Sequence, residues 1–415
     1  GTTGMPKGVM LTHSNIMHNV RCIPGIIALT PEDRWLSVLP TWHIFERTAE
    51  YVALAGGCCL VYSSVKTFAQ DLVEYRPTVV ATVPRIWESL HNRVLTALRK
   101  KGALASSIFN FLVQVSVKFR RSRRILNDQL PQFHHPALLS RLMRKTGAGI
   151  KCLFLGPFYL LAQRKLKLVQ ERFGGRLRLA VSGGGSLADF LEDWIDAVGI
   201  RIVNAYGMTE CSPAIAGRGL DCKTYGTLGR AVVHTDLRVV AEDGTECAAG
   251  EEGLIEVRGP QVAIGYHNNE VETNRAFTAD GYLRTGDLGR MTINDELVIT
   301  GRAKDIIVLA SGENVDPTRI ESTITMFPFI EDAVLVGQDR KGLAALLVPN
   351  HEEFKGWAEK TFSNLRKETE ELLSDNRILE QIRKEINLHL KPKRGFKAHE
   401  RLLGITFLDK VLKSG

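Results

Sequence analysis

The sequence lacks the long hydrophobic runs of a membrane-spanning protein. None of its apolar stretches reaches the roughly 18 residues that a transmembrane helix needs, so we expect no integral membrane segment. No signal-peptide pattern is visible at its start. With 415 residues and an ordinary apolar content, the chain can instead bury large cores, which predicts a globular protein of at least two domains.

Paired cysteines are also missing. The seven cysteines are an odd number, are scattered and contain no C-x-x-C pair. They are Cys22, Cys58, Cys59, Cys152, Cys211, Cys222 and Cys247. This pattern favours neither a disulfide framework nor a zinc site, and it indicates a reducing compartment such as the cytoplasm.

Acidic residues are scarce in one part of the chain. Between Arg93 and Lys167 the only acid is Asp128, although the formal charge of the whole chain is just +8. Such a segment suits anionic lipid headgroups, an acidic carrier protein, or the phosphates of a nucleotide or coenzyme A. The alternative is a solvated basic face. Nucleic acid is disfavoured because no helix-turn-helix, zinc-finger or RNA-binding signature accompanies the charge.

The same basic segment has apolar residues at intervals. Between Val94 and Gly156 we expect helices with one apolar side. This favours a long acyl chain or a peripheral membrane contact through residues 93–167, although a helical insertion packed into the core would look similar.

The stretch from Leu177 to Glu210 is the most informative. Residues 179–181 predict a short buried strand, a glycine-rich loop follows at 182–185, and Ser186 is expected to N-cap a helix. Apolar residues recur in that helix at the spacing of one face: Leu187, Phe190, Leu191, Trp194, Ile195 and Val198. Gly199 ends the helix and residues 200–203 begin a strand, so the unit is predicted to be βαβ.

Two loops of this unit should meet at one edge of the sheet, where folds of this kind bind ligands. The second loop contains Tyr206, whose ring can stack on a base, and Thr209, whose hydroxyl can hold a phosphate oxygen. The carboxylate of Glu210 could hold Mg²⁺ on that phosphate. The alternative is a pair of tight turns in an α/β core, because glycine-rich turns after strands are common.

A second phosphate-sized loop stands at the start of the chain. Its small residues and hydroxyls, Gly1-Thr2-Thr3-Gly4-Met5-Pro6-Lys7-Gly8, could surround phosphate oxygens, with a positive charge supplied by Lys7. The spacing is not that of a Walker A loop, so a P-loop ATPase or kinase is a poor alternative.

Four motifs occur in the order typical of AMP-forming, adenylate-forming synthetases. They are G-T-T-G-M-P-K-G-V at 1–9, Y-G-M-T-E at 206–210, Y-L-R-T-G-D at 282–287 and G-R-A-K-D at 301–305. The sequence resembles the long-chain acyl-CoA and acyl-acyl-carrier-protein synthetases of that superfamily along nearly its whole length. The resemblance implies ATP, Mg²⁺ and either coenzyme A or the phosphopantetheine of acyl carrier protein as cofactors.

The resemblance also implies roles for individual residues. Those expected around the nucleotide are Thr2, Thr3, Gly4 and Lys7 at the pyrophosphate, Gly183, Gly184, Gly185, Tyr206 and Gly207 at adenine, Thr209 at the α-phosphate, Glu210 at the metal, and Asp287 and Arg302 at the ribose. His43 is expected to orient the carboxylate of the acid, although it could be a hydrogen-bonded core histidine. Lys304 matches the hinge about which the family's C-terminal lid swings.

The predicted fold is α/β, with a large parallel-sheet nucleotide-binding domain and a small mobile α+β lid. We expect the large domain over 1–222, its β subdomain over 223–301 and the lid over 302–415. Compared with the family the chain looks truncated at both ends. The family's lid carries a lysine that bridges the carboxylate of the acid and the adenylate phosphate, and neither Lys410 nor Lys413 matches it. We therefore expect little acyl-adenylate formation by these 415 residues alone.

The expected function is activation of a long-chain fatty acid through an acyl-adenylate, followed by transfer to coenzyme A. Acyl carrier protein as the acceptor is a close alternative. A non-catalytic acyl or nucleotide binder is an alternative of another class, which the presence of Thr209, Glu210 and Asp287 disfavours. The expected location is cytoplasmic and peripheral to the membrane. The acyl length and the oligomeric state stay open.

Overall fold

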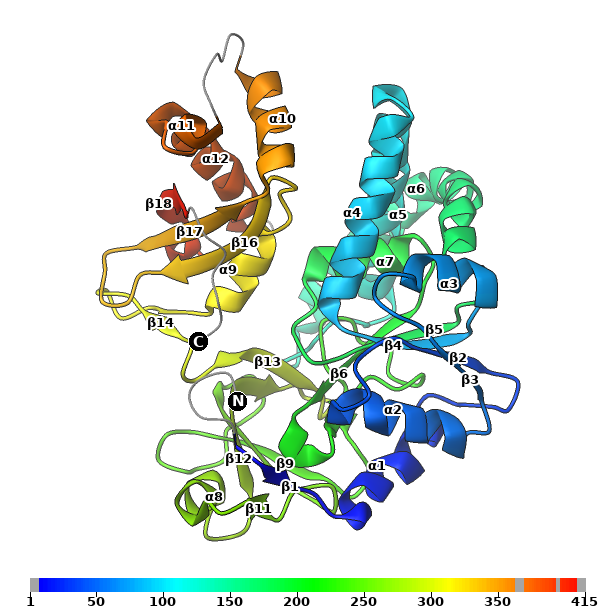
Figure 1. Cartoon of the computed structure of the whole chain (residues 1–415), viewed down its shortest axis with the longest axis vertical. Coiled ribbons are helices and arrows are strands. Elements are labelled where there is room, and N and C mark those ends of the chain that lie inside the picture. Colours follow the sequence, from blue (N-terminus) through cyan, green and yellow to red (C-terminus); the bar gives the residue numbers. More distant parts are fainter. Residues whose placement is uncertain (1–6, 363–368, 393–395, 409–415) are drawn as a thin grey trace. The chain divides into compact units, whose positions relative to one another are not determined.

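A computed structural model describes residues 7–362, 369–392 and 396–408. The described chain divides into two compact units, the first over residues 7–300 and the second from residue 301 onward (Figure 1). Thr2, Thr3 and Gly4, expected at the pyrophosphate, lie outside the described residues.

A seven-stranded sheet forms the centre of the first unit, in the order β3-β2-β4-β5-β6-β7-β8. The strands are β2 (Arg34–Ser37), β3 (Cys59–Tyr62), β4 (Val79–Thr82), β5 (Leu179–Ser182), β6 (Ile202–Gly207), β7 (Ala214–Gly217) and β8 (Arg230–Ala231). The strands from β3 to β6 are parallel, whereas β7 and β8 are antiparallel to their neighbours. The predicted α/β class and the βαβ unit are confirmed, and the sheet is mixed rather than wholly parallel.

Helices cover both faces of this sheet (Figure 1). One face carries α1 (His13–Ile26) and α2 (Ile44–Ala55), and the other carries α3 (Phe68–Tyr75), α4 (Pro84–Lys100), α5 (Ala103–Leu126), α6 (Leu138–Arg172) and α7 (Asp189–Ala197). Successive strand residues point to opposite faces, so Val79 packs under α1 and α2 while Val80 packs under the other helices. Apolar residues on both sides of each strand explain why the strands read as continuous hydrophobic runs.

A smaller antiparallel sheet completes the first unit, in the order β13-β12-β10-β9. Its strands are β9 (Asp236–Val240), β10 (Gly253–Arg258), β12 (Leu283–Met291) and β13 (Leu297–Arg302). Beside it, β1 (Val9–Met10) pairs with β11 (Gly265–Tyr266), which leads into α8 (Glu270–Ala276). This pairing joins the start of the described chain to a segment more than 250 residues away.

In its described residues, the second unit has a three-stranded sheet and four α-helices. Its strands are β16 (Ile330–Val336), β17 (Leu343–Pro349) and β18 (Leu402–Phe407), with a separate pair, β14 (Ile307–Val308) and β15 (Asn314–Val315). Its helices are α9 (Pro317–Ile324), α10 (His351–Thr361), α11 (Thr369–Leu373) and α12 (Asn376–His389). Their apolar faces share one core with the sheet, so this unit has a hydrophobic centre of its own.

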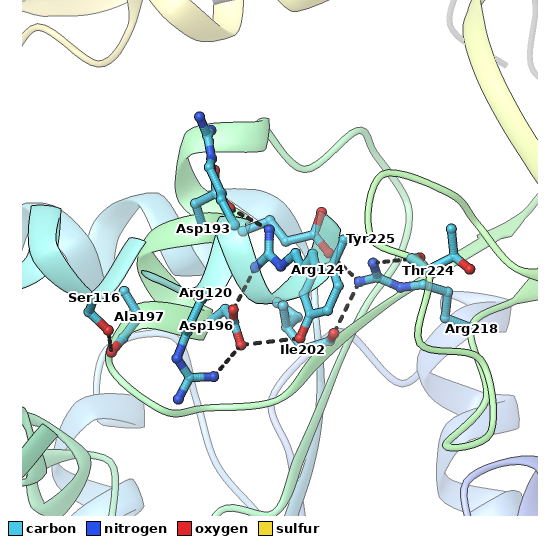
Figure 2. Close-up of polar contacts among 12 residues, drawn as sticks. Ser116, Arg120, Arg124, Asp193, Asp196, Ala197, Ile202, Arg218, Thr224 and Tyr225 are labelled. Atoms are coloured by element: carbon cyan, nitrogen blue, oxygen red, sulfur yellow. Dashed lines mark hydrogen bonds and ion pairs between the residues drawn. The ribbon is translucent and has the colours of Figure 1, made fainter. Parts of the chain in front are cut away.

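Three of the four arginines of α5 do not form the basic outer face that residues 93–167 were expected to provide, whereas Arg123 is exposed. Arg120 binds Asp196, Arg121 binds Asp193, and Arg124 binds both aspartates of α7 (Figure 2). Arg124 is only 8% exposed in its side chain. The prediction was wrong for Arg120, Arg121 and Arg124, because α5 packs on α7, whose acids lie outside the basic segment and pair with these arginines.

None of the helices in the described residues is long and apolar enough to cross a membrane.

Candidate functional site

The glycine loop leaves β5 at the carboxyl edge of the large sheet. At Gly183 a side chain would begin 3.0 Å from the ring of Phe45, and Gly184 has a left-handed φ of +71°. Both positions therefore favour glycine. The prediction that Ser186 caps the next helix was wrong, because α7 begins at Asp189 with Ala188 as its N-cap. Leu187 is already buried in the core before that helix starts.

His43 stands at the start of the helix that brings Phe45 to this loop. It is the N-cap of α2, and its Nδ1 accepts a hydrogen bond from the backbone N–H of Phe45 at 3.2 Å. The side chain is exposed. The alternative of a hydrogen-bonded core histidine is therefore wrong, and the role in orienting a carboxylate stays a prediction.

Tyr206 and Asp287 come from different sheets and meet in the interior. The hydroxyl of Tyr206, on β6, donates to Oδ2 of Asp287, on β12, at 2.6 Å, and both residues are buried. Burial, with the carboxylate as a second cause, raises the pKa of Tyr206 well above its usual value. The tyrosine thus stays protonated and holds the aspartate in place. A carboxylate can accept about four hydrogen bonds, so this contact leaves capacity for a ligand hydroxyl.

Gly207 ends β6 where the chain folds back on itself. A side chain here would begin 2.1 Å from the carbonyl oxygen of Pro213. Only glycine fits this approach of β7 to β6. Thr209 follows in a short 3-10 helix, η1 (Thr209–Cys211), where it is exposed. Its hydroxyl forms no hydrogen bond with any other residue that the structure describes, so it can donate one to a ligand oxygen.

Lys7 and Glu210 are joined through Tyr266, a residue that the sequence did not single out. The Tyr266 hydroxyl donates to Oε1 of Glu210 at 2.7 Å, and Nζ of Lys7 lies 5.2 Å from the centre of the Tyr266 ring. Lys7 also forms an ion pair with Glu272, which lies in the first turn of α8. The hydrogen bond from Lys7, together with its charge, lowers the pKa of the Glu272 carboxyl, while burial and Glu210 raise the pKa of Tyr266.

The pairing of β1 with β11 creates this cluster, since Val9 lies opposite Tyr266 and the N–H of His267 donates to the carbonyl of Gly8 at 2.7 Å. No local signal in the sequence could have identified Tyr266 or Glu272. The partner of Tyr266 in this cluster, Glu210, is 56 positions away, and the partner of Glu272, Lys7, is 265 positions away.

Glu210 can serve as a ligand to Mg²⁺ that is also bound by a nucleotide. Mg²⁺ commonly takes one or two protein carboxylates together with phosphate oxygens and water. Within the described ranges, no three His, Cys, Asp or Glu side chains gather as a protein-only metal site. The half-buried Glu210 carboxylate, held at one oxygen by Tyr266, suits such a shared site.

Glu46 is a second residue that the sequence did not single out. It lies in the first turn of α2, is fully buried, and accepts hydrogen bonds from the Ser37 hydroxyl and from the N–H of Val38, the latter at 3.2 Å. Burial raises its pKa to about 7, and the neighbouring Glu50 adds to the rise. Its carboxylate anchors the segment between β2 and α2 that carries His43.

Arg302 is the last residue of β13, just past the division at residue 300, and Lys304 follows it in the second unit. Both are exposed, in a turn in which the carbonyl of Arg302 accepts the N–H groups of Asp305 and Ile306. Their expected roles, at the ribose and as a hinge, stay predictions.

Two family descriptions cover most of the chain. Residues 1–267 match the family described as "AMP-binding enzyme", and residues 304–400 match "AMP-binding enzyme C-terminal domain". The first match includes Lys7, the glycine loop and the segment from Tyr206 to Glu210.

Curated relatives include two plant proteins from Arabidopsis thaliana. "Probable acyl-activating enzyme 16, chloroplastic" is 32% identical over 404 residues, which cover 92% of this chain and 55% of the relative. "Long-chain-fatty-acid--[acyl-carrier-protein] ligase AEE15, chloroplastic" is 33% identical over 370 residues, or 85% of this chain and 50% of the relative. The chain thus spans about half the length of these relatives.

Solved structures share the fold. ATP-bound MatB from Rhodopseudomonas palustris superposes with a TM-score of 0.63 at 22% identity, covering 100% of this chain and 63% of that one. O-succinylbenzoate coenzyme A synthetase from Bacillus subtilis, in complex with ATP and magnesium ion, gives 0.62 at 20% identity, covering 100% and 66%. At these identities the likeness concerns the fold.

Proposed function

The chain belongs to the AMP-binding enzyme family, and on that premise we propose that it activates a long-chain fatty acid with ATP. A carboxylate oxygen of the acid attacks the α-phosphorus, the bond to pyrophosphate breaks, and an acyl-adenylate forms. A thiol then attacks the acyl carbonyl and AMP leaves. The observation that carries this proposal is the convergence of Lys7, Tyr266 and Glu210 within the family-matched segment.

The side chains bind and orient the reactants rather than react covalently. Gly183, Gly184, Gly185 and the Tyr206–Gly207 turn would hold adenine, and Asp287, fixed by Tyr206, would accept the ribose hydroxyls with help from Arg302. Thr209 would donate to the α-phosphate. His43, at the N-cap of α2, would orient the acid, and Lys304 would serve as the hinge.

Lys7 would bind the leaving pyrophosphate together with Thr2, Thr3 and Gly4. For this it must exchange its ion pair with Glu272 for phosphate oxygens. Glu210 would hold Mg²⁺, which when bound neutralises negative charge on the triphosphate. Tyr266 keeps the Glu210 carboxylate oriented by its hydrogen bond.

The acceptor thiol is proposed to be coenzyme A, with acyl carrier protein as the alternative. A cleft in the second unit supports a phosphate-bearing acceptor of either kind. Its lining includes Lys341, His399 and Arg401 and contains no acidic residue. Nδ1 of His399 lies 3.9 Å from Oε1 of Glu313, which belongs to the loop between β14 and β15. Both acceptors carry phosphate, so this cleft alone does not choose between them.

For a membrane surface as a further partner, we propose α6 rather than α5 as the contacting element, since Arg120, Arg121 and Arg124 of α5 are already paired with acids of α7.

ATP–pyrophosphate exchange with a panel of fatty acids tests the proposal. We expect exchange with long-chain acids, and loss of exchange in Glu210→Ala with unchanged folding, because a lost metal ligand costs several kcal/mol of charge stabilisation. Undiminished exchange in that variant would refute the role of Glu210. ATP binding without exchange by the wild-type protein would favour the non-catalytic binder. Thioester formation with coenzyme A and carrier protein offered separately identifies the acceptor.

A further inference from the structure

The side of α6 that does not pack on α5 carries large apolar side chains. We define the outward face of α6 by six of these residues, each between 51% and 78% exposed: Leu142, Met143, Ile150, Leu153, Phe154 and Leu161. These residues recur at helical spacing along one stripe. Contiguous apolar surface of this kind is uncommon on monomers and marks an interaction site.

The opposite side of α6 is fully used. Ala148, Ala162 and Leu166 are buried, the Tyr159 ring stacks on Phe119 of α5 with centroids 4.0 Å apart, and Gln163 donates to Ser116 at 3.0 Å. The helix is therefore anchored by one side. Its outward face is not a core surface that a small rotation of the helix would bury, because rotation would expose the anchored side.

The polar residues beside the outward face are basic. Besides Arg172 at its end, five exposed cations of α6 form no ion pair with any residue in the described parts of the chain. They are Arg144, Lys151, Arg164, Lys165 and Lys167. No acidic residue occurs in the sequence between Gln129 and Gln170. The face thus combines apolar side chains with uncompensated positive charge.

We propose that the outward face of α6 docks on an anionic lipid membrane. Its apolar residues would enter the boundary between headgroups and acyl chains, and its lysines and arginines would meet the lipid phosphates. The positive charge of this face favours an anionic membrane as its partner. A second copy of the chain would bring two basic faces together. The helix would lie on the bilayer, since no helix of the described residues can span it. The proposal does not depend on the adenylation chemistry.

Vesicle flotation with the whole protein tests this docking. The vesicles are phosphatidylcholine with or without phosphatidylserine. We expect binding only to the anionic vesicles, and a loss of binding at high salt because exposed charges are screened over about 10 Å at 0.1 M. Equal binding to both vesicle types, or no binding to either, would overturn the proposal.

Two sets of substitutions locate the contact. Leu142→Ser with Leu153→Ser and Phe154→Ser removes apolar area, and Lys151→Glu with Lys165→Glu reverses charge. Each set should lower the vesicle partition coefficient at least tenfold. Both should keep the wild-type unfolding midpoint, because the altered side chains are exposed.

Matched controls lie elsewhere on the surface of the first unit. Leu54→Ser with Val271→Ser removes comparably exposed apolar residues, and Lys66→Glu with Lys223→Glu reverses exposed charges away from α6. These controls should bind vesicles as the wild type does. Binding that is lost equally in the controls, or kept in both α6 sets, would refute the docking. Self-association that the α6 variants abolish, with vesicle binding intact, would assign the face to a second copy instead.

Discussion

Helices α5 and α6 are adjacent and both are rich in basic and apolar residues, yet their charges have opposite surroundings. On α5, Arg124 lies between Asp193 and Asp196 and stacks 3.6 Å from the centre of the Tyr225 ring (Figure 2). On α6, Lys151 and Lys165 are exposed, and the outward face of α6 is uncovered. The two helices have the same kinds of residues. What differs is the element that each helix meets.

The α5 network extends beyond its own helix. Arg218 binds Glu192 and donates to the carbonyl of Ile202 at 3.1 Å, and the Tyr225 hydroxyl donates to Asp196 at 3.1 Å. Ser116 donates to the carbonyl of Ala197 at 3.0 Å (Figure 2). These contacts fix α7, which directly follows the glycine loop. The charges of α5 therefore stabilise the proposed nucleotide site, whereas those of α6 are available to an external partner.

The largest effect is expected from Arg124→Met. Removing one partner of a buried ion pair leaves Asp193 and Asp196 undercompensated, which costs about 3–5 kcal/mol. Urea unfolding measures this loss. The matched change Arg144→Met on α6 should alter the free energy of unfolding by less than about 0.5 kcal/mol, because that side chain is exposed. Equal losses in the two variants would remove the distinction between the helices.

A pair of leucines on α6 sharpens the comparison within one helix. Leu166 is 1% exposed and Leu153 is 78% exposed. Leu166→Ala should cost about 2–5 kcal/mol of stability, because it leaves a cavity against the core. Leu153→Ala should cost almost nothing. A similar cost for both, measured by the same unfolding experiment, would mean that the outward face is covered in solution.

Glu46 supplies a buried charge that, unlike Arg124, has no cationic partner among its described contacts. Its pKa in the folded state is about 7, above the usual 4.5, so the folded protein binds the proton more tightly than the unfolded chain. The contribution of Glu46 is thus most favourable at acid pH and is lost as the pH rises through 7.

Glu46→Gln should therefore stabilise the protein at pH 8 relative to the wild type, by at most about 2–3 kcal/mol, and much less at pH 5. Thermal or urea unfolding at both values measures the difference. Glu32→Gln, at an exposed position, is the control and should show no gain of this size. A constant effect of Glu46→Gln across this range would show that its carboxylate is charged throughout.

The smallest effect is expected from Tyr225→Phe. The ring under Arg124 is kept, and only the hydrogen bond to Asp196 is lost, which costs about 1 kcal/mol. Tyr225→Leu removes the cation–π contact as well and should cost about 1 kcal/mol more. A larger loss for phenylalanine than for leucine would contradict the stacking of Arg124 on this ring.

The sequence predicted best where the signal was local. The spacing of Leu191, Trp194 and Ile195 marked the buried face of α7, and all three are in the core. The start of that helix was predicted two residues too early, because Ser186 has the chemistry of a cap but Leu187 is buried in the core before the helix begins. Local capping preference is weaker than burial of a large apolar side chain.

The motifs singled out the proposed site residues, but the sequence did not reveal the residues that support them. Glycines at 183 and 207 were visible in the sequence, whereas the Phe45 ring and the Pro213 carbonyl that require them were not. Tyr266 could not be predicted because its partner Glu210 lies 56 positions earlier, on another element.

The sequence by itself determined the α/β class, the βαβ unit and the family, because apolar periodicity and short motifs act over a few residues. Only the tertiary structure decided which charges are internal. Whether an arginine is solvated or buried depends on the helix packed against it, and Asp193 and Asp196 come from a segment more than 60 residues beyond α5. The same dependence on packing left the outward face of α6 uncovered, since apolar spacing alone does not say how many sides of a helix find a partner.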